Sequence, residues 1–103
     1  MEKAKFKIRI DQKNQLGVDG WDDVEFMFTA NEGEDIMPLA KIGSGGELSR
    51  VMLALKVVFG NADSIGTFVF DEIDTGISGR TAQKVAEKMY KVAKTKQILC
   101  ITH

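Results

Sequence analysis

Two short motifs in this chain contain residue types that together can bind a nucleotide and its metal ion. They are Ser44-Gly45-Gly46-Glu47 and, after a short apolar run, Asp71-Glu72. An acid at the end of a buried strand can hold the Mg²⁺ that neutralises the β- and γ-phosphates of a nucleotide. A neighbouring carboxylate can orient or deprotonate the attacking water. We therefore assign Asp71 to the metal ion and Glu72 to the role of catalytic base.

The first motif has the composition of a phosphate-binding helix start. Ser44 and Glu47 match a capping box, in which the serine accepts a hydrogen bond from a free backbone N–H and the glutamate reaches back. Gly45 and Gly46 then lie in the first turn, where free N–H groups and the positive end of the helix favour an anion. An ordinary capped helix without a ligand is the alternative, and the double glycine favours the functional interpretation.

The main phosphate cradle of a nucleotide site is missing from this sequence. No phosphate loop of the form G-x-x-x-x-G-K-[ST] occurs in the 103 residues. The glycine motif lacks the lysine of such a loop, so we expect it to make a secondary contact with phosphate. The chain therefore contains only part of an ATP-hydrolysing site.

A third candidate, His103, is the only histidine and the last residue, and it follows a second apolar run. In open α/β sheets, ligands bind outside the carboxyl ends of the strands. Asp71, Glu72 and His103 are therefore expected at one edge of a sheet, where His103 would donate to a γ-phosphate. A terminal histidine or a pair of acids is usually just solvated, so the role of His103 depends on the family resemblance described below.

The elements that must position these residues follow from the apolar pattern. Apolar residues recur at helical spacing over 47–59 and over 81–94, while short β-rich runs occupy 67–70 and 97–102. This alternation predicts an α/β fold with a mostly parallel sheet and flanking helices. The strand at 67–70 is expected to be buried on both faces. The inward helix faces are predicted to be Leu48, Val51, Met52, Leu55, Val58 and Phe59, and then Ala82, Val85, Ala86, Met89, Val92 and Ala93.

The amino-terminal part predicts an antiparallel strand pair. Residues 5–10 and 24–29 alternate between apolar and polar side chains. Turn-forming residues are spread over about a dozen positions between them, which predicts a long connection. These turn-forming residues are Asn14, Gly17, Asp19 and Gly20. We expect residues 1–41 to form this strand region and a loop, and residues 42–103 to form the α/β part.

Composition excludes several classes of protein. The net charge of -1 gives no general electrostatic reason to bind nucleic acid or acidic membranes. The single cysteine, Cys100, excludes an internal disulfide and a cysteine-based metal site, and we expect it to be a buried small hydrophobe. No apolar run approaches the roughly 18 residues that a membrane span needs. We therefore expect a soluble cytoplasmic protein with no membrane partner.

The order and spacing of the three motifs resemble the ABC ATPase superfamily. Ser44 to Glu47 is similar to its signature motif, Phe68 to Glu72 to its Walker B strand, and His103 to its switch histidine. Within this superfamily, SGGELSR, FDEIDTGISGR and a final CITH resemble the C-terminal head segment of RecN, a family of bacterial SMC-like DNA repair ATPases. The corresponding D-loop is Asp74, Thr75, Gly76, Ile77 and Ser78, with serine where many superfamily members have aspartate at the last position.

This resemblance implies a partial SMC-type P-loop ATPase head that uses ATP and Mg²⁺. The implied partners are the N-terminal Walker A half of the same head and a second head in an ATP-dependent dimer. Ser44, Gly45, Gly46 and Glu47 would bind the nucleotide there, with the signature motif acting in trans on the partner's γ-phosphate. In the full-length, nucleoid-associated protein, head engagement would serve DNA double-strand-break repair and recombination. The chain itself is expected to be an inactive fragment, because the Walker A half is absent.

Two alternatives remain open at this stage. The same half-head can be a non-enzymatic dimerisation or interaction module, since the missing half leaves an apolar sheet edge to cover. It can also belong to another SMC-like or ABC ATPase with a different cargo. A long coiled coil in the parent protein favours the RecN-type head over a transporter ATPase, whereas membrane-spanning partners favour a transporter.

Overall fold

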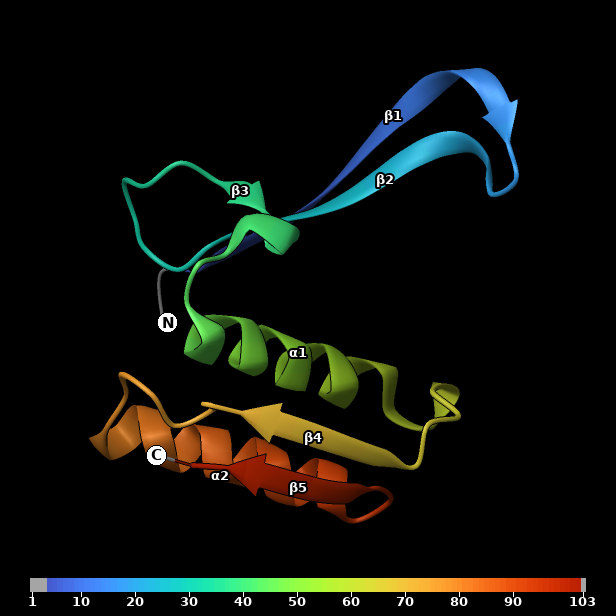
Figure 1. Cartoon of the computed structure of the whole chain (residues 1–103). Helices are drawn as coiled ribbons and strands as arrows, with labels where there is room; N and C mark the ends of the chain where they lie inside the picture. The colour runs from blue at the N-terminus through green and yellow to red at the C-terminus, as the bar shows by residue number, and fades with distance from the viewer. Residues whose placement is uncertain (1–3, 103) are drawn as a thin grey trace. The chain divides into compact units, whose positions relative to one another are not determined.

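The computed structural model of this chain describes residues 4–102 and has an α/β composition (Figure 1). The chain forms two compact units, one up to Ile42 and one from Gly43 onward. Each unit has its own sheet. Within residues 4–102, no helix is long and apolar enough to cross a membrane.

The first unit is a three-stranded antiparallel sheet in the order β1-β2-β3. Its strands are β1 (Lys5–Gly17), β2 (Gly20–Thr29) and the short β3 (Met37–Pro38), which is followed by the 3-10 helix η1 (Leu39–Lys41). The pairing of β1 with β2 confirms the predicted antiparallel pair.

The predicted long connection between β1 and β2 is wrong. The strands continue to a two-residue turn, Val18-Asp19, and Asn14 lies within β1. Gly20 adopts a φ of 103°, which the tight turn requires and which glycine adopts without steric cost. The register of β1 against β2 shifts between Gln12 and Gly17, and the two strands are paired again at Gly17 and Gly20, next to the turn.

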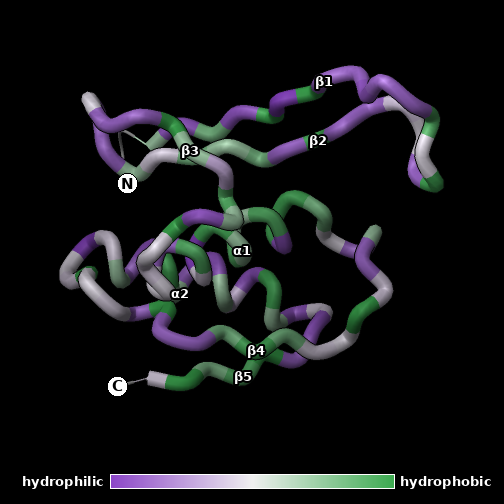
Figure 2. The backbone as a smooth tube through the Cα atoms, turned by 45° about the horizontal axis from the view of Figure 1, so that its top comes forward, coloured by the Kyte–Doolittle hydropathy of each residue, from purple (hydrophilic) through white to green (hydrophobic). Residues whose placement is uncertain are grey.

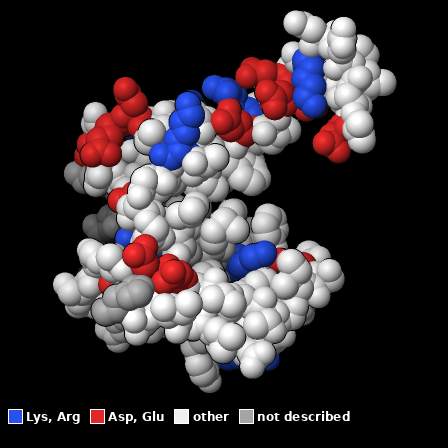
Figure 3. Space-filling view, viewed as in Figure 1, with Lys and Arg blue, Asp and Glu red and all other residues white. Residues whose placement is uncertain are grey.

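The β1–β2 hairpin has one apolar and one charged face. Its apolar register pairs are Phe6 with Phe28, Ile8 with Phe26, and Ile10 with Val24. Phe28 is buried, but Ile8 is 54% exposed and Ile10 60% exposed. The other face carries an ion pair between Arg9 and Glu25, and acidic and basic side chains alternate along the hairpin in Figure 3.

The second unit confirms the predicted order of helix, strand, helix and strand. It consists of α1 (Gly45–Phe59), the 3-10 helix η2 (Gly60–Ala62), β4 (Thr67–Asp71), α2 (Gly79–Ala93) and β5 (Gln97–Ile101). The strands pair in parallel, from Thr67 beside Gln97 to Asp71 beside Ile101. Their carboxyl ends therefore lie at the same edge of this small sheet.

The core of the second unit lies on one face of the β4–β5 sheet. It is formed by Leu53, Phe68, Phe70, Ile73 and Val92, with Val57, Val85, Met89 and Ile98 packed against it. Both helices contribute to this cluster, so the other face of the sheet is uncovered. Val69 is 59% exposed and Leu99, its register partner, is 51% exposed. The expectation that β4 is buried on both faces is therefore wrong, although the middle of each strand is hydrophobic (Figure 2).

The helix faces agree only partly with the prediction. In α2, Val92 is buried, and Val85 and Met89 pack against the core, whereas Ala86 and Ala93 are exposed. In α1 the buried residues are Gly46, Arg50, Val51 and Leu53. The other α1 residues expected inward are partly or fully exposed, namely Leu48, Met52, Leu55, Val58 and Phe59. Because α1 is apolar on more than one side, periodicity did not identify the face that packs on the sheet.

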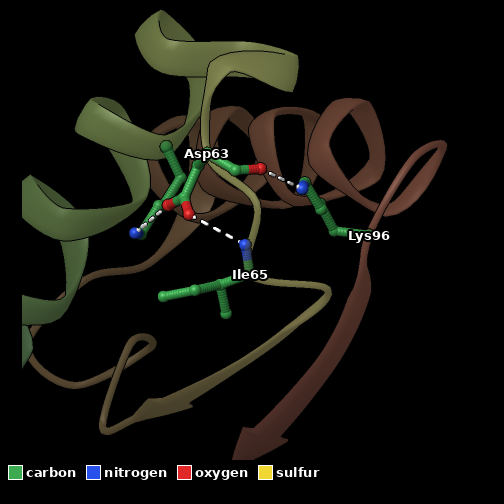
Figure 4. A network of polar contacts seen from close by, with 4 residues as sticks. Asp63, Ile65 and Lys96 are labelled. Atoms are coloured by element: carbon green, nitrogen blue, oxygen red, sulfur yellow. Dashed lines mark hydrogen bonds and ion pairs between the residues drawn. The ribbon is translucent and has the colours of Figure 1, made fainter.

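A polar network secures the end of this unit that lies opposite the carboxyl ends of the strands (Figure 4). The Asp63 carboxylate accepts hydrogen bonds from Lys56 Nζ and, at 3.0 Å, from the Ile65 N–H. Lys96 Nζ donates to the Asp63 carbonyl oxygen. The Lys56 hydrogen bond, followed by that of Ile65, holds the pKa of Asp63 below its ordinary value of 3.8. The network thus joins α1 to the turn between α2 and β5.

Candidate functional site

The two acidic candidates lie where β4 ends. Asp71 is the last residue of β4 and is exposed, and Glu72 follows it with a partly buried side chain. The Glu72 N–H donates to the Ile101 carbonyl oxygen at 3.1 Å, which fastens this residue to the end of β5. The expected edge position of both acids is therefore observed. His103, the third residue expected there, lies outside the described residues.

The glycine motif begins α1 at the same edge. Ser44 is the N-cap residue, and its Oγ accepts a hydrogen bond from the Glu47 N–H at 3.2 Å, which confirms the serine half of the predicted capping box. A Cβ atom added to Gly45 would overlap the Glu72 carboxylate. The structure therefore brings the two sequence motifs into contact, and glycine at position 45 is what allows the contact.

Glu72 has an unusual backbone conformation. Its φ is 60°, and it is the one residue other than glycine with a positive φ in the described part of the chain. A left-handed conformation is unfavourable for a residue with a Cβ, and it persists where surrounding contacts impose it. The Glu72 carbonyl oxygen accepts from the Thr75 N–H at 3.0 Å, so the backbone of Glu72 is bonded on both sides.

Two side chains in the SGGELSR stretch contact the Asp71–Thr75 segment and were not assigned from the sequence. Ser49 Oγ donates to the Asp71 carbonyl oxygen. Arg50 Nη1 donates to the carbonyl oxygens of Ile73, at 3.1 Å, and Thr75, at 2.8 Å. The sequence signal for Arg50 is a charged residue one helical turn after Gly46 and directly before the apolar run 51–55.

The five residues expected to form the D-loop connect the acidic pair to α2. Asp74, Thr75 and Gly76 are exposed, Ile77 is partly buried, and Ser78 is the N-cap residue of α2. Ile73, which precedes them, is only 2% exposed and belongs to the core. The loop is therefore anchored at its base while its middle faces outward.

The donor set at this edge is consistent with a magnesium ion bound together with a nucleotide. No group of three or more His, Cys, Asp or Glu side chains that could hold a metal occurs within residues 4–102. Mg²⁺ needs no such group, because it is commonly held by one or two carboxylates together with phosphate oxygens and water. Asp71 can supply such a carboxylate, and Glu72 lies next to it.

Cys100 is exposed, which corrects the expectation that it is buried. It lies on β5, which in the two-stranded sheet of the second unit pairs only with β4. Partial desolvation and then the charge of Asp74 raise the pKa of its thiol above the ordinary 9.0. The thiol is therefore protonated at neutral pH, and we assign it no part in the chemistry of the site.

Comparison with known proteins identifies the family. No protein-family model matches the chain. The chain is 58% identical over 91 residues to the DNA repair protein RecN of Treponema pallidum, which covers 88% of the chain and 16% of that protein. It is 47% identical over 107 residues to RecN of Halalkalibacterium halodurans and 45% identical over 118 residues to RecN of Bacillus subtilis, in both cases over 100% of the chain. The chain spans 19% and 20% of those two proteins. It is therefore a segment of the RecN family.

Proposed function

We propose that this segment is the C-terminal lobe of an ATP-binding and ATP-hydrolysing head that acts in DNA double-strand-break repair and recombination. The observation that carries the proposal is the meeting of the glycine start of α1 with Glu72, the residue after Asp71, at the carboxyl ends of two parallel strands. Ligands of α/β sheets bind at this edge. The name of the similar proteins, DNA repair protein RecN, supports the biological setting.

Each residue of the site has a separate task in this proposal. Asp71 holds Mg²⁺, which supplies charge neutralisation at the phosphates, and Glu72 orients and deprotonates the attacking water. The α1 start acts in trans on the γ-phosphate of a nucleotide held by a second head, through Ser44, Gly45, Gly46 and Glu47. His103 donates to the γ-phosphate of its own head, and residues 74–78 form the D-loop.

The proposed partners are the N-terminal Walker A half of the same head, a second head and, through the full-length protein, DNA. The exposed apolar face of β4 and β5 supports the first of these, because a hydrophobic sheet face is normally covered. The proposed compartment is the cytoplasm, with the full-length protein associated with the nucleoid.

The test uses a complete RecN-type protein that contains this segment. Glu72→Gln removes the base and keeps the shape of the side chain, so ATP binding is expected to persist while hydrolysis falls by about 100- to 10,000-fold. Glu87→Gln makes the same chemical change at an exposed position on α2 and is expected to leave hydrolysis unchanged. Normal turnover by the Glu72→Gln protein with ATP still bound would refute the assignment of the base.

A second candidate function is a non-enzymatic interaction module. The observation that favours it is the amount of exposed apolar surface, including Ile8 and Ile10 in the first unit and Val69 and Leu99 in the second. Mixing the chain with the Walker A half separates the two functions. Hydrolysis that appears in the mixture and is lost with Glu72→Gln supports the ATPase, whereas a mixture that assembles and binds ATP without hydrolysis supports the module.

A further inference from the structure

Arg50 is a buried charged side chain that the proposed chemistry does not use. It is 9% exposed, and its Nε has no hydrogen-bond partner among the described residues. Its Nη1 is turned to two backbone carbonyl oxygens, those of Ile73 and Thr75. Burying a cation is unfavourable unless its hydrogen bonds are made. The two bonds to the 73–75 backbone are therefore the main interactions that keep this guanidinium in place.

The segment that Arg50 contacts also sets the backbone of Glu72. The Thr75 N–H donates to the Glu72 carbonyl oxygen, while Arg50 binds the carbonyl oxygen of the same Thr75. Ile73, the other residue bound by Arg50, directly follows Glu72 and is anchored in the core. The left-handed conformation of Glu72 thus lies at the start of a turn whose carbonyl groups Arg50 holds.

Gly46 places the start of α1 against the same turn. A Cβ atom on Gly46 would lie 3.0 Å from Arg50 Nη1, from the Glu72 carbonyl oxygen and from the Thr75 carbonyl oxygen. These contacts are too close for a side chain to fit without movement of the backbone. The first turn of α1, the Arg50 guanidinium and the turn after Glu72 therefore form one closely packed cluster.

We propose that Arg50 is a positioning residue for Glu72. It ties α1 to the turn after β4, so that the position of α1 sets the direction of the Glu72 side chain. In this role Arg50 acts through its bonds to the Ile73 and Thr75 carbonyl oxygens. The catalytic consequence rests on the proposed role of Glu72 as base, whereas the structural link between Arg50 and the turn does not.

The structural link is tested by hydrogen exchange in a complete RecN-type protein that contains this segment. Arg50→Met keeps much of the length of the side chain and removes its donors, so the amides of residues 72–76 are expected to exchange at least about tenfold faster. Arg50→Lys retains a donor and is expected to restore part of the protection. Arg80→Met, an exposed arginine on α2, is the matched control and is expected to change nothing.

Two results of this measurement would overturn the proposal. The first is unchanged protection of residues 72–76 in Arg50→Met. The second is a uniform loss of protection through α1, β4 and α2, which would mean that Arg50 only stabilises the fold. A loss confined to the turn supports the proposal, and amides of β4 serve as the internal reference.

Hydrolysis kinetics in the same proteins test the consequence for Glu72. Arg50→Met is expected to lower kcat by about 10- to 100-fold with KM within about twofold, because the base is misplaced while nucleotide binding is kept. Combined with Glu72→Gln, it is expected to cause no further loss, whereas losses that multiply would mean an independent effect and would contradict the proposal. If Glu72→Gln alone has no effect, the proposed base is wrong, and the exchange measurement still decides whether Arg50 holds the turn.

Discussion

Gly45 and Gly46 are adjacent, but a side chain would meet different obstacles at the two positions. At Gly45 the obstacle is the flexible end of Glu72, and at Gly46 it includes two backbone carbonyl oxygens. Around Gly43, in contrast, an added Cβ would have no neighbour within 4 Å. The two glycines of the motif are therefore expected to serve different purposes, one at the carboxylate and one in the packing.

Alanine substitutions separate these purposes. Gly46→Ala is expected to lower the free energy of unfolding by about 1–3 kcal/mol, because the backbone must move to admit the methyl group. Gly45→Ala is expected to change it by less than about 1 kcal/mol, since alanine favours helix and Glu72 can swing away, but it should reduce ATP hydrolysis. Urea unfolding of the complete protein measures the free energy of unfolding, and turnover measures ATP hydrolysis. Gly43→Ala is the control for both measurements. Equal destabilisation by the two motif substitutions would show that the distinction is wrong.

At this scale, the sequence allowed the serine cap and the position of the acidic pair to be predicted. Ser44 bonds within its own helix start, and such local pairs have a fixed spacing. The contacts of Ser49 and Arg50 were not predicted, because both side chains bond to backbone carbonyl oxygens. Every residue has a carbonyl group, so this kind of partner leaves no signal in the identity of the residue that provides it.

Among the elements, the connection from α1 to β4 depends on Asp63. Because the pKa of Asp63 is lowered in the folded chain, its charged form stabilises the fold at pH values above the ordinary 3.8. This contribution is lost as the pH falls through the lowered value. Acidification should therefore loosen the junction that Lys56, Asp63 and Lys96 form.

We expect Asp63→Asn to show a smaller decrease in the free energy of unfolding between pH 7 and pH 3 than the unmodified chain. The asparagine variant has no carboxylate to protonate at this position, so that part of the pH dependence disappears. Urea titrations at the two pH values provide the measurement, with Glu87→Gln as the exposed control. A pH dependence identical to that of the unmodified chain would rule out a contribution from Asp63.

The elements themselves were predictable where one physical signal dominated. The helices and parallel strands of the second unit follow from helical spacing and from short apolar runs. The α1 face was mispredicted because Leu48, Met52 and Val58 also have helical spacing, and only the tertiary fold selects Arg50 and Leu53 instead. The hairpin turn was mispredicted because turn-forming residues such as Asn14 can also be accommodated in a strand.

For the molecule as a whole, each unit exposes apolar side chains that a stable isolated domain would normally cover. The apolar face of the β4–β5 sheet includes Val69 and Leu99, and the hairpin exposes Ile8 and Ile10. The chain corresponds to 16–20% of the RecN proteins cited above. The exposed apolar side chains are consistent with contacts to other segments of a longer RecN protein. The sequence of this chain alone does not identify those segments.

We expect the isolated chain to self-associate with rising concentration through the open sheet face. Val69→Thr combined with Leu99→Thr should weaken this association without unfolding the second unit, because threonine suits a strand and both positions are exposed. Sedimentation velocity at several concentrations measures the effect. Val18→Thr changes an exposed residue in the hairpin turn and should not alter the association. A wild-type chain that stays monomeric throughout would contradict this expectation.

The bond from the Glu72 N–H to the Ile101 carbonyl oxygen also has a consequence for the order of events during synthesis. The ribosome makes the acidic pair before it makes α2 and β5, so Glu72 leaves the exit tunnel with no partner strand to hold it. Because β4 and β5 are parallel, the whole crossover must be translated before they can pair. The most constrained backbone in the site is therefore among the last parts of the unit to take its final form.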